Sequence, residues 1–155
     1  MDLELAADRL QVEGHYVIEN PGSAATSVAI HFPVSVDADR PAPTTMEVDG
    51  RTLTPSVEGG TASVAFPIEV PPKSIRRFTV QYAQPHRGRV AEYVVTSART
   101  WPTPIGSAVF TVRHDPALGE VEVSLPTEVT IQADQVVHVA VLADFSPAEE
   151  LRITW

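Results

Sequence analysis

The chain has 155 residues, enough for one domain with its own hydrophobic core or for two very small ones. Its 20 acidic and 11 basic residues give a formal net charge of −9, and a surface of that sign repels the phosphates of nucleic acid. The absence of cysteine excludes disulfides, thiolate metal sites and a cysteine nucleophile. No apolar run reaches the roughly 20 residues needed to cross a bilayer, so we expect no membrane insertion within this segment.

The first half of the chain is dominated by alternating apolar and polar residues, which is typical of half-buried strands. Strands are expected over residues 10–20, 26–34, 45–57, 61–70 and 74–83. Asp49-Gly50 predicts a hairpin turn in which both residues take positive φ, and Glu58 to Gly60 predicts a second turn. The alternation slips at Arg76-Arg77, which indicates a bulge.

The second half continues the same pattern. Strands are expected over residues 89–98, 107–115, 119–126 and 136–145, followed by a turn and a last strand before Trp155. The run 136–145 is almost continuously apolar, which indicates a central strand buried on both faces. Residues 93–112, "YVVTSARTWPTPIGSAVFTV", are predicted to be two strands of one hairpin with Trp101 in the turn between them.

About ten strands with almost no helix predict an all-β, antiparallel β-sandwich of the immunoglobulin-like kind. We expect a single domain over residues 1–155, with a possible boundary between two lobes at residues 84–88. The chain stops at "LRITW", apparently within a strand, and we expect it to be a domain of a longer protein.

Trp101 is the aromatic residue that does not fall on an alternating apolar face. Pro102 and Pro104 stiffen the turn that carries it. We expect the ring to be more than half buried and to close one end of the sandwich. The alternative is an exposed platform for a sugar or a peptide.

Acidic residues supply the other candidate ligand site. Asp37 and Asp39 lie in a polar, proline-rich loop, and calcium takes oxygen ligands from such loops, but two carboxylates alone lack the spacing of an EF-hand. Strand-borne glutamates such as Glu13 and Glu92 could serve glycoside hydrolysis only if two of them faced one cleft.

Catalytic and metal sites find little support in the residue pattern. No nucleophile elbow or phosphate-binding glycine loop occurs. His15 and His31 fall on predicted polar faces, while His138 lies among valines, so a zinc site is not expected. We therefore predict no catalytic residue, no metal ligand and no cofactor.

Several segments together resemble bacterial envelope β-sandwich domains of unknown function and, distantly, domains of the vault/inter-alpha-trypsin type. They are "HYVIENPGSAATSVAIHFPV", "VDGRTL", "VPPKSIRRFTVQY", the stretch 93–112 and "FSPAEELRITW". Those families often carry Thr-Gly before the Trp, where this chain has Thr96-Ser97-Ala98. The resemblance implies a non-catalytic adhesion, scaffold or interaction domain.

The expected function is therefore a structural or protein-interaction module of a bacterial cell-surface or secreted protein. Its partner would be another protein or a neighbouring domain of a longer chain. The alternatives are a carbohydrate- or calcium-binding module using Trp101, Asp37 and Asp39, and a small hydrolase using His138 or a pair of glutamates. Absence of cysteine fits both the cytosol and a bacterial exterior.

Overall fold

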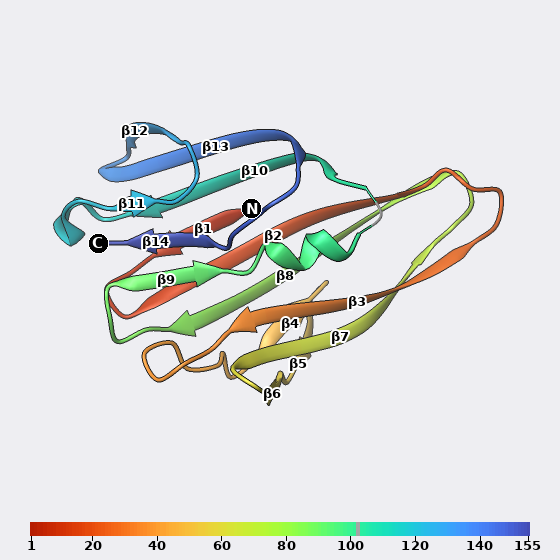
Figure 1. Ribbon diagram of the computed structural model, residues 1–155, viewed down its shortest axis with the longest axis horizontal. Helices are drawn as coiled ribbons and strands as arrows, with labels where there is room; N and C mark the ends of the chain where they lie inside the picture. Colours follow the sequence, from red (N-terminus) through yellow and green to blue (C-terminus); the bar gives the residue numbers. More distant parts are fainter. Residues whose placement is uncertain (102) are drawn as a thin grey trace.

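The computed structural model describes residues 1–101 and 103–155, and Figure 1 shows their arrangement in two layers of β-structure. One layer is a sheet with the strand order β12-β13-β10-β1-β2-β8-β4-β5, which we call the large sheet. Its strands are β1 Asp2–Leu5, β2 Arg9–Asn20, β4 Met46–Val48, β5 Arg51–Leu53, β8 Ser74–Pro85, β10 Ile105–His114, β12 Glu128–Gln132 and β13 Gln135–Phe145.

The other layer consists of two three-stranded sheets. One has the order β3-β7-β6, and its strands are β3 Thr26–Ser35, β6 Ser56–Glu58 and β7 Thr61–Val70. The other has the order β11-β14-β9, and its strands are β9 Val90–Tyr93, β11 Glu122–Val123 and β14 Leu151–Thr154. Two 3₁₀ helices, η1 Thr96–Thr100 and η2 Pro116–Leu118, complete the regular structure of the described residues.

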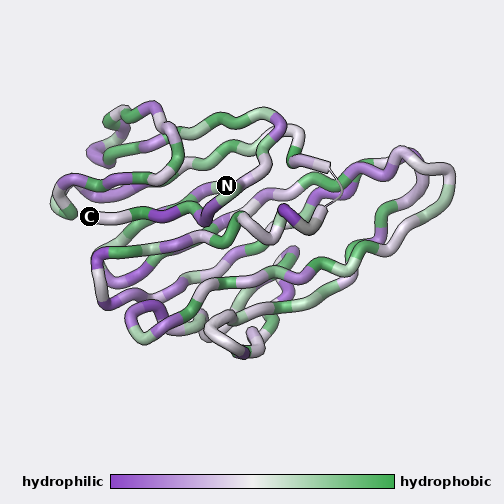
Figure 2. Tube along the Cα trace, viewed as in Figure 1, coloured by the Kyte–Doolittle hydropathy of each residue, from purple (hydrophilic) through white to green (hydrophobic). Residues whose placement is uncertain are grey.

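The hydrophobic core lies between these layers, as the alternation of side chains along the strands requires. Leu3 and Leu10 of the large sheet, Val34 of β3 and Ile153 of β14 are almost completely buried in one continuous cluster. Figure 2 shows the alternation of hydrophobic and hydrophilic residues along the strands that makes one face of each strand apolar. The architecture is therefore all-β and sandwich-like, and its sheets do not close into a barrel.

One pairing differs from the prediction of a wholly antiparallel fold. β1 is antiparallel to β2 but parallel to β10, with Leu3 opposite Val112, so the large sheet is mixed. The first strand was missed because "DLEL" is short and carries two acids, yet Leu3 and Leu5 point into the core. The described residues hold fourteen strands rather than about ten, because the predicted strand 45–57 divides into β4, β5 and β6 and because β1 and β12 were not predicted.

The turn predictions at Asp49-Gly50 and Glu58–Gly60 are confirmed. Asp49 and Gly50 have φ of 49° and 75° between β4 and β5, and Gly59 and Gly60 have φ of 56° and 81° between β6 and β7. The left-handed conformation of both central residues is what a tight hairpin of this kind needs.

The predicted bulge at Arg76-Arg77 is wrong. The pairing of β2 with β8 runs without interruption, with Ile18 opposite Arg76 and Val17 opposite Arg77. The alternation slips because Ile75 lies on the outer face of the sheet, where it is exposed.

The predicted hairpin over residues 93–112 is also wrong. β9 pairs with β14, whereas β10 pairs with β13 and β1, so the two strands lie in different sheets. Between them the chain forms η1 and crosses from one layer to the other.

The prediction that the strand 136–145 is buried on both faces holds only in part. β13 is buried on both faces near Val137 and His138, whereas Val141 is exposed.

Candidate functional site

An apolar groove of about 600 Å³ opens between the two layers, where β2 and β10 of the large sheet face β3 and η1. Its lining is mostly aliphatic and aromatic, as in many ligand sites. The side chains that define it include Tyr16, Ile30, Phe32, Tyr93, Trp101 and Phe110.

Trp101 lies along this groove and does not close the sandwich. It follows η1, and its backbone N–H donates to the carbonyl of Ala98 at 3.1 Å. The residue is 47% exposed, so slightly more than half of its surface is covered, as expected. However, the Trp101 side chain is not among those that pack against the hydrophobic core. It lines the apolar groove and does not close the end of the sandwich. Pro102, the residue predicted to stiffen this turn, lies outside the described residues.

Two tyrosines join the layers at the floor of the groove. The hydroxyl groups of Tyr16 and Tyr93 are 2.6 Å apart, and the ring of Tyr16 stacks on Phe78 at a centroid distance of 4.9 Å. Burial raises the pKa of both phenols well above the usual value. Both therefore stay neutral at physiological pH and present hydroxyl groups rather than charges.

The position of η1 is held by a carboxylate from the far end of the chain. Glu150, just before β14, accepts hydrogen bonds from the backbone N–H groups of Val95 at 2.7 Å and Thr96 at 3.0 Å. It also accepts from the hydroxyl of Thr96. The carboxylate satisfies N–H groups at the start of the helix, where a negative charge is favourable. This contact fixes one wall of the groove.

The groove carries no charged side chain among the described residues that line it, although the chain as a whole has a net charge of −9. Besides the two tyrosines, its titratable side chains are His15 and His31, and both are exposed as predicted. The charged α-amino group of Met1 also borders the groove. A largely apolar lining without charged side chains favours an occupant that presents apolar groups.

Asp37 and Asp39 are not part of this groove, so the structure does not bring them together with Trp101. The carboxylate of Asp37 is engaged by Arg40, whose Nη2 lies 2.7 Å from Oδ2, and by the backbone N–H groups of Asp39 and Arg40. The guanidinium of Arg40 lowers the pKa of Asp37. Because a cation already neutralises this carboxylate, the loop is a poor start for a calcium site.

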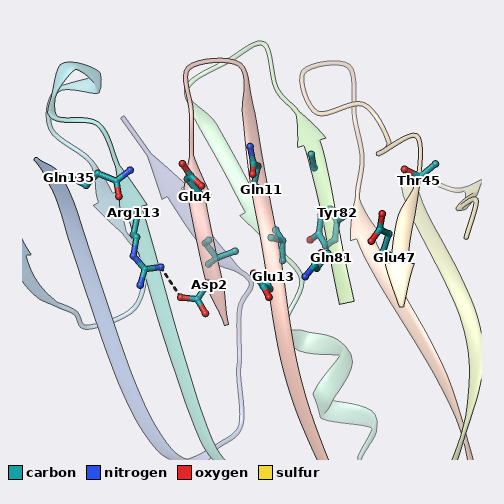
Figure 3. A pocket seen from close by; sticks show the side chains of 13 residues that line it. Asp2, Glu4, Gln11, Glu13, Thr45, Glu47, Gln81, Tyr82, Arg113 and Gln135 are labelled. Carbon is teal, nitrogen blue, oxygen red and sulfur yellow. Dashed lines mark hydrogen bonds and ion pairs between the residues drawn. The ribbon is translucent and has the colours of Figure 1, made fainter. Parts of the chain in front are cut away.

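A second, polar groove of about 610 Å³ lies on the opposite face of the large sheet. Figure 3 shows side chains from β1, β2, β4, β8, β10 and β13 that stand side by side along it. Asp2 and Glu13 face each other on neighbouring strands, and Asp2 also forms an ion pair with Arg113 at 2.8 Å. Of the strand glutamates considered for hydrolysis, Glu13 thus shares a groove with another acid, whereas Glu92 lies on β9 and binds Arg40.

The histidines do not converge as a set. His15 and His31 lie on different sheets, and His138 bonds instead to His114, with 3.2 Å between the two Nε2 atoms. Among the described residues no three His, Cys, Asp or Glu side chains gather as a metal site. His114 ends a run of alternating residues, and the register of β10 with β13 that brings it to His138 cannot be seen in the sequence.

Comparison with known proteins supports the fold only. No protein-family model and no curated protein matches this chain. A crystal structure of a Legionella pneumophila protein, provisionally named a nutrient binding protein, superposes with a TM-score of 0.62 at 10% identity. The alignment covers 99% of this chain but 64% of the Legionella protein, so this chain spans less than two thirds of that length. An M1 zinc metallopeptidase from Deinococcus radiodurans aligns with a TM-score of 0.46 at 13% identity, over 99% of this chain and 40% of the peptidase.

The likeness to the Legionella protein agrees with an all-β, sandwich-like chain. In the described part of the chain, no helix has the length and apolar character needed to cross a membrane.

Proposed function

We propose that this chain is a non-catalytic protein-interaction module of a bacterial cell-surface or secreted protein. The observation that supports this proposal is the apolar groove, which combines a half-covered tryptophan with a largely apolar lining. Exposed apolar recesses of this size on a soluble domain are typical of binding sites. The partner is another protein or a neighbouring domain of a longer chain.

The remaining parts of the proposal come from the sequence resemblance. Likeness to bacterial envelope domains supports a location in the envelope or outside the cell, and a distant relation to immunoglobulin-like and vault-type domains. Fractionation of the source bacterium, with the protein detected by antiserum, tests the location. Recovery in the cytosol alone would contradict it.

The interaction is tested by photo-crosslinking in the source bacterium. A benzoylphenylalanine at Trp101 should crosslink to one discrete partner, because this side chain borders the groove. The matched control places the same group at Ile131, an exposed apolar residue of β12 outside the groove. Equal labelling from both positions, or none from Trp101, would contradict the proposal.

The polar groove supports a second candidate, a module that binds a polyhydroxylated ligand such as a carbohydrate. Carboxylates and carboxamides of Glu13, Gln11, Gln81 and Glu47 point from adjacent strands into one recess and could bond to hydroxyl groups (Figure 3). Binding on a glycan array that is lost in Gln81→Ala but kept in Trp101→Ala would favour this candidate. The absence of binding to any glycan would contradict the carbohydrate-binding candidate and leave protein interaction as the proposed function.

A further inference from the structure

The large sheet ends at β12, an edge strand whose five residues are all exposed. In the described part of the chain, β13 is the only strand that pairs with it (Figure 1). Proteins usually protect such an edge with lysine, proline, a bulge or a very short strand. The sequence of β12, "EVTIQ", contains neither lysine nor proline, and it pairs with β13 without interruption. The free edge of β12 is therefore unprotected.

Two aliphatic side chains of β12 lie on the face of the large sheet that forms the core. Val129 lies opposite His138, and Ile131 lies opposite Val136. His138 in turn lies opposite Val112, which is a core residue, and directly opposite residues share one face of a sheet. Nevertheless, Val129 is 57% exposed and Ile131 is 77% exposed. The core face of the sheet is thus uncovered at β12, and burial of these two side chains would be favourable.

The turn between β12 and β13 indicates which backbone groups of β12 are already bonded. Ala133 and Asp134 have φ of 48° and 65°, as in a two-residue hairpin, and Gln132 lies opposite Gln135. In such a turn the two flanking residues bond to each other. Backbone groups of alternate residues point to the same side of a strand. The even-numbered residues of β12 therefore turn their N–H and C=O groups toward β13.

The strands on the other side of β13 lead to the same assignment. The N–H of Thr111 donates to the carbonyl of Met1 on the β1 side of β10, so even-numbered residues of β10 face β13. The register pairs them with even-numbered residues of β13, and it pairs odd-numbered residues of β13 with even-numbered residues of β12. Val129 and Ile131 thus turn their backbone groups to the free edge.

This edge is complementary to a second copy of itself. When two copies of β12 pair antiparallel about Thr130, Val129 lies opposite Ile131 of the second copy. Their backbone groups then form the hydrogen-bonded pairs of an antiparallel ladder, and the two Thr130 side chains meet between them. Charge fits the same register, because Glu128 lies opposite Gln132 of the second copy, whose amide can donate to the carboxylate. No two like charges lie opposite each other.

We propose that β12 binds a second copy of this chain, so that two large sheets join into one sheet across an antiparallel pair of β12 strands. This surface lies outside the apolar groove, which stays open in the dimer. Only five residues of each copy pair, against about 20–30 in a standard interface, so the dimer should be weak, with a Kd on the order of 100 µM. The net charge of −9 on each copy opposes association, and added salt should tighten the dimer.

Sedimentation equilibrium of the full chain tests whether the dimer forms. Between about 10 µM and about 1 mM, the average mass should rise from that of one chain toward twice that value. Ile131→Lys places a charge in the paired edge and should raise the Kd about tenfold or more. Because the Ile131 side chain is exposed in the single chain, this variant should fold. A monomer at the highest concentration overturns the proposal.

Val57→Lys is the matched control, since it makes the same change of charge on another edge strand. Val57 lies on β6 and is 60% exposed. The Kd of this variant should stay within about twofold of the wild-type value, because it differs by one charge in nine. Equal effects of the two substitutions would show that β12 is not the interface and would overturn the proposal.

Single cysteines test the register, because the chain contains none of its own. Thr130→Cys brings two thiols to a non-hydrogen-bonded position, where Cα atoms lie about 4.5 Å apart, within the range that a disulfide spans. Air oxidation should therefore give a covalent dimer. In Gln132→Cys the two thiols are offset by four residues, roughly 13 Å, and should crosslink about tenfold more slowly or less. Equal rates would indicate random collision and would overturn the proposal.

A foreign partner at the same edge gives a different result. It would leave the purified chain monomeric at every concentration, and this outcome rejects pairing of two copies. In the source bacterium, a benzoylphenylalanine at Ile131 should capture this chain itself and no other protein. Its product is therefore distinguished by mass from a partner captured at Trp101.

Discussion

At the scale of single residues, the His114–His138 pair makes the stability of the fold depend on pH. Burial, and secondly the nearby His114, lower the pKa of His138. The unfolded chain therefore binds this proton more readily than the folded one, so the contribution of neutral His138 to stability is complete above about pH 6.5 and falls as the pH drops below it. We expect the free energy of unfolding in urea to decline between pH 7.5 and pH 5 less steeply in His138→Phe than in the wild type.

The control for this prediction is His31→Gln, which removes an exposed histidine and should keep the wild-type slope. Equal slopes in His138→Phe and the wild type would show that the buried pair does not set the pH dependence.

Gly14 is important for local packing because it has no side chain, which leaves room for the ring of Tyr16. A Cβ on this residue would lie 2.5 Å from the ring of Tyr16, which is already stacked on Phe78 and in edge contact with Phe32. We expect Gly14→Ala to displace the ring, break its bond to Tyr93 and lower the free energy of unfolding by about 1–3 kcal/mol. Gly106→Ala, where a Cβ meets no atom within 4 Å, should leave the urea midpoint unchanged or slightly higher.

At the scale of elements, η1 depends on a side chain that is distant in sequence. Glu150→Gln removes the negative charge of the carboxylate that accepts hydrogen bonds from the backbone N–H groups of Val95 and Thr96. We expect this change to lower the free energy of unfolding by about 1–3 kcal/mol. The exposed neighbour Glu149 provides the matched change, since Glu149→Gln should have little effect. The two variants are compared by urea unfolding and by Trp101 fluorescence, and equal stability would contradict the role of the cap.

Elements were predictable where local alternation and turn chemistry decide them. β2, β3, β7, β8 and β14 fall within two or three residues of their predicted ranges. Strand pairing was not predictable in the same way, because the partner of a strand depends on contacts far away in the chain. β9 illustrates this: its sequence continues apolar through Val94 and Val95, yet pairing with β14 ends at Tyr93.

Only part of the candidate site could be predicted from the sequence. Trp101 stood out as an aromatic residue outside the alternating faces, and it does line the apolar groove. The interest in Asp37 came from its loop position alone. Arg40, three residues further along the same loop, was not considered as its partner, although their ion pair is local in the sequence.

At the scale of the whole molecule, the two layers share one core and should unfold together. Residues 84–88, considered as a boundary between lobes, instead join distant segments. The side chain of Gln84 donates to the carbonyl of Ser35 at 2.7 Å, His86 donates its N–H to Asp8 at 2.9 Å, and Arg87 donates its N–H to Asp39 at 2.8 Å. Other contacts cross from one side of this segment to the other, since β1 pairs with β10 and Arg40 forms an ion pair with Glu92 at 3.1 Å. A boundary between independent units would be crossed by few such contacts.

We therefore expect one calorimetric transition, with an enthalpy on the order of 100 kcal/mol near 60 °C and a calorimetric to van't Hoff ratio close to one. Gln84→Ala leaves the partly buried carbonyl of Ser35 without this donor, so it should shift the whole transition downward by about 2–4 °C for each kcal/mol lost, without splitting it. Two resolved transitions, in the wild type or in the variant, would show that the lobes are thermodynamically separate. Because residues from both sides of this segment line the apolar groove, such a split would also mean that the groove is lost in the first of the two transitions.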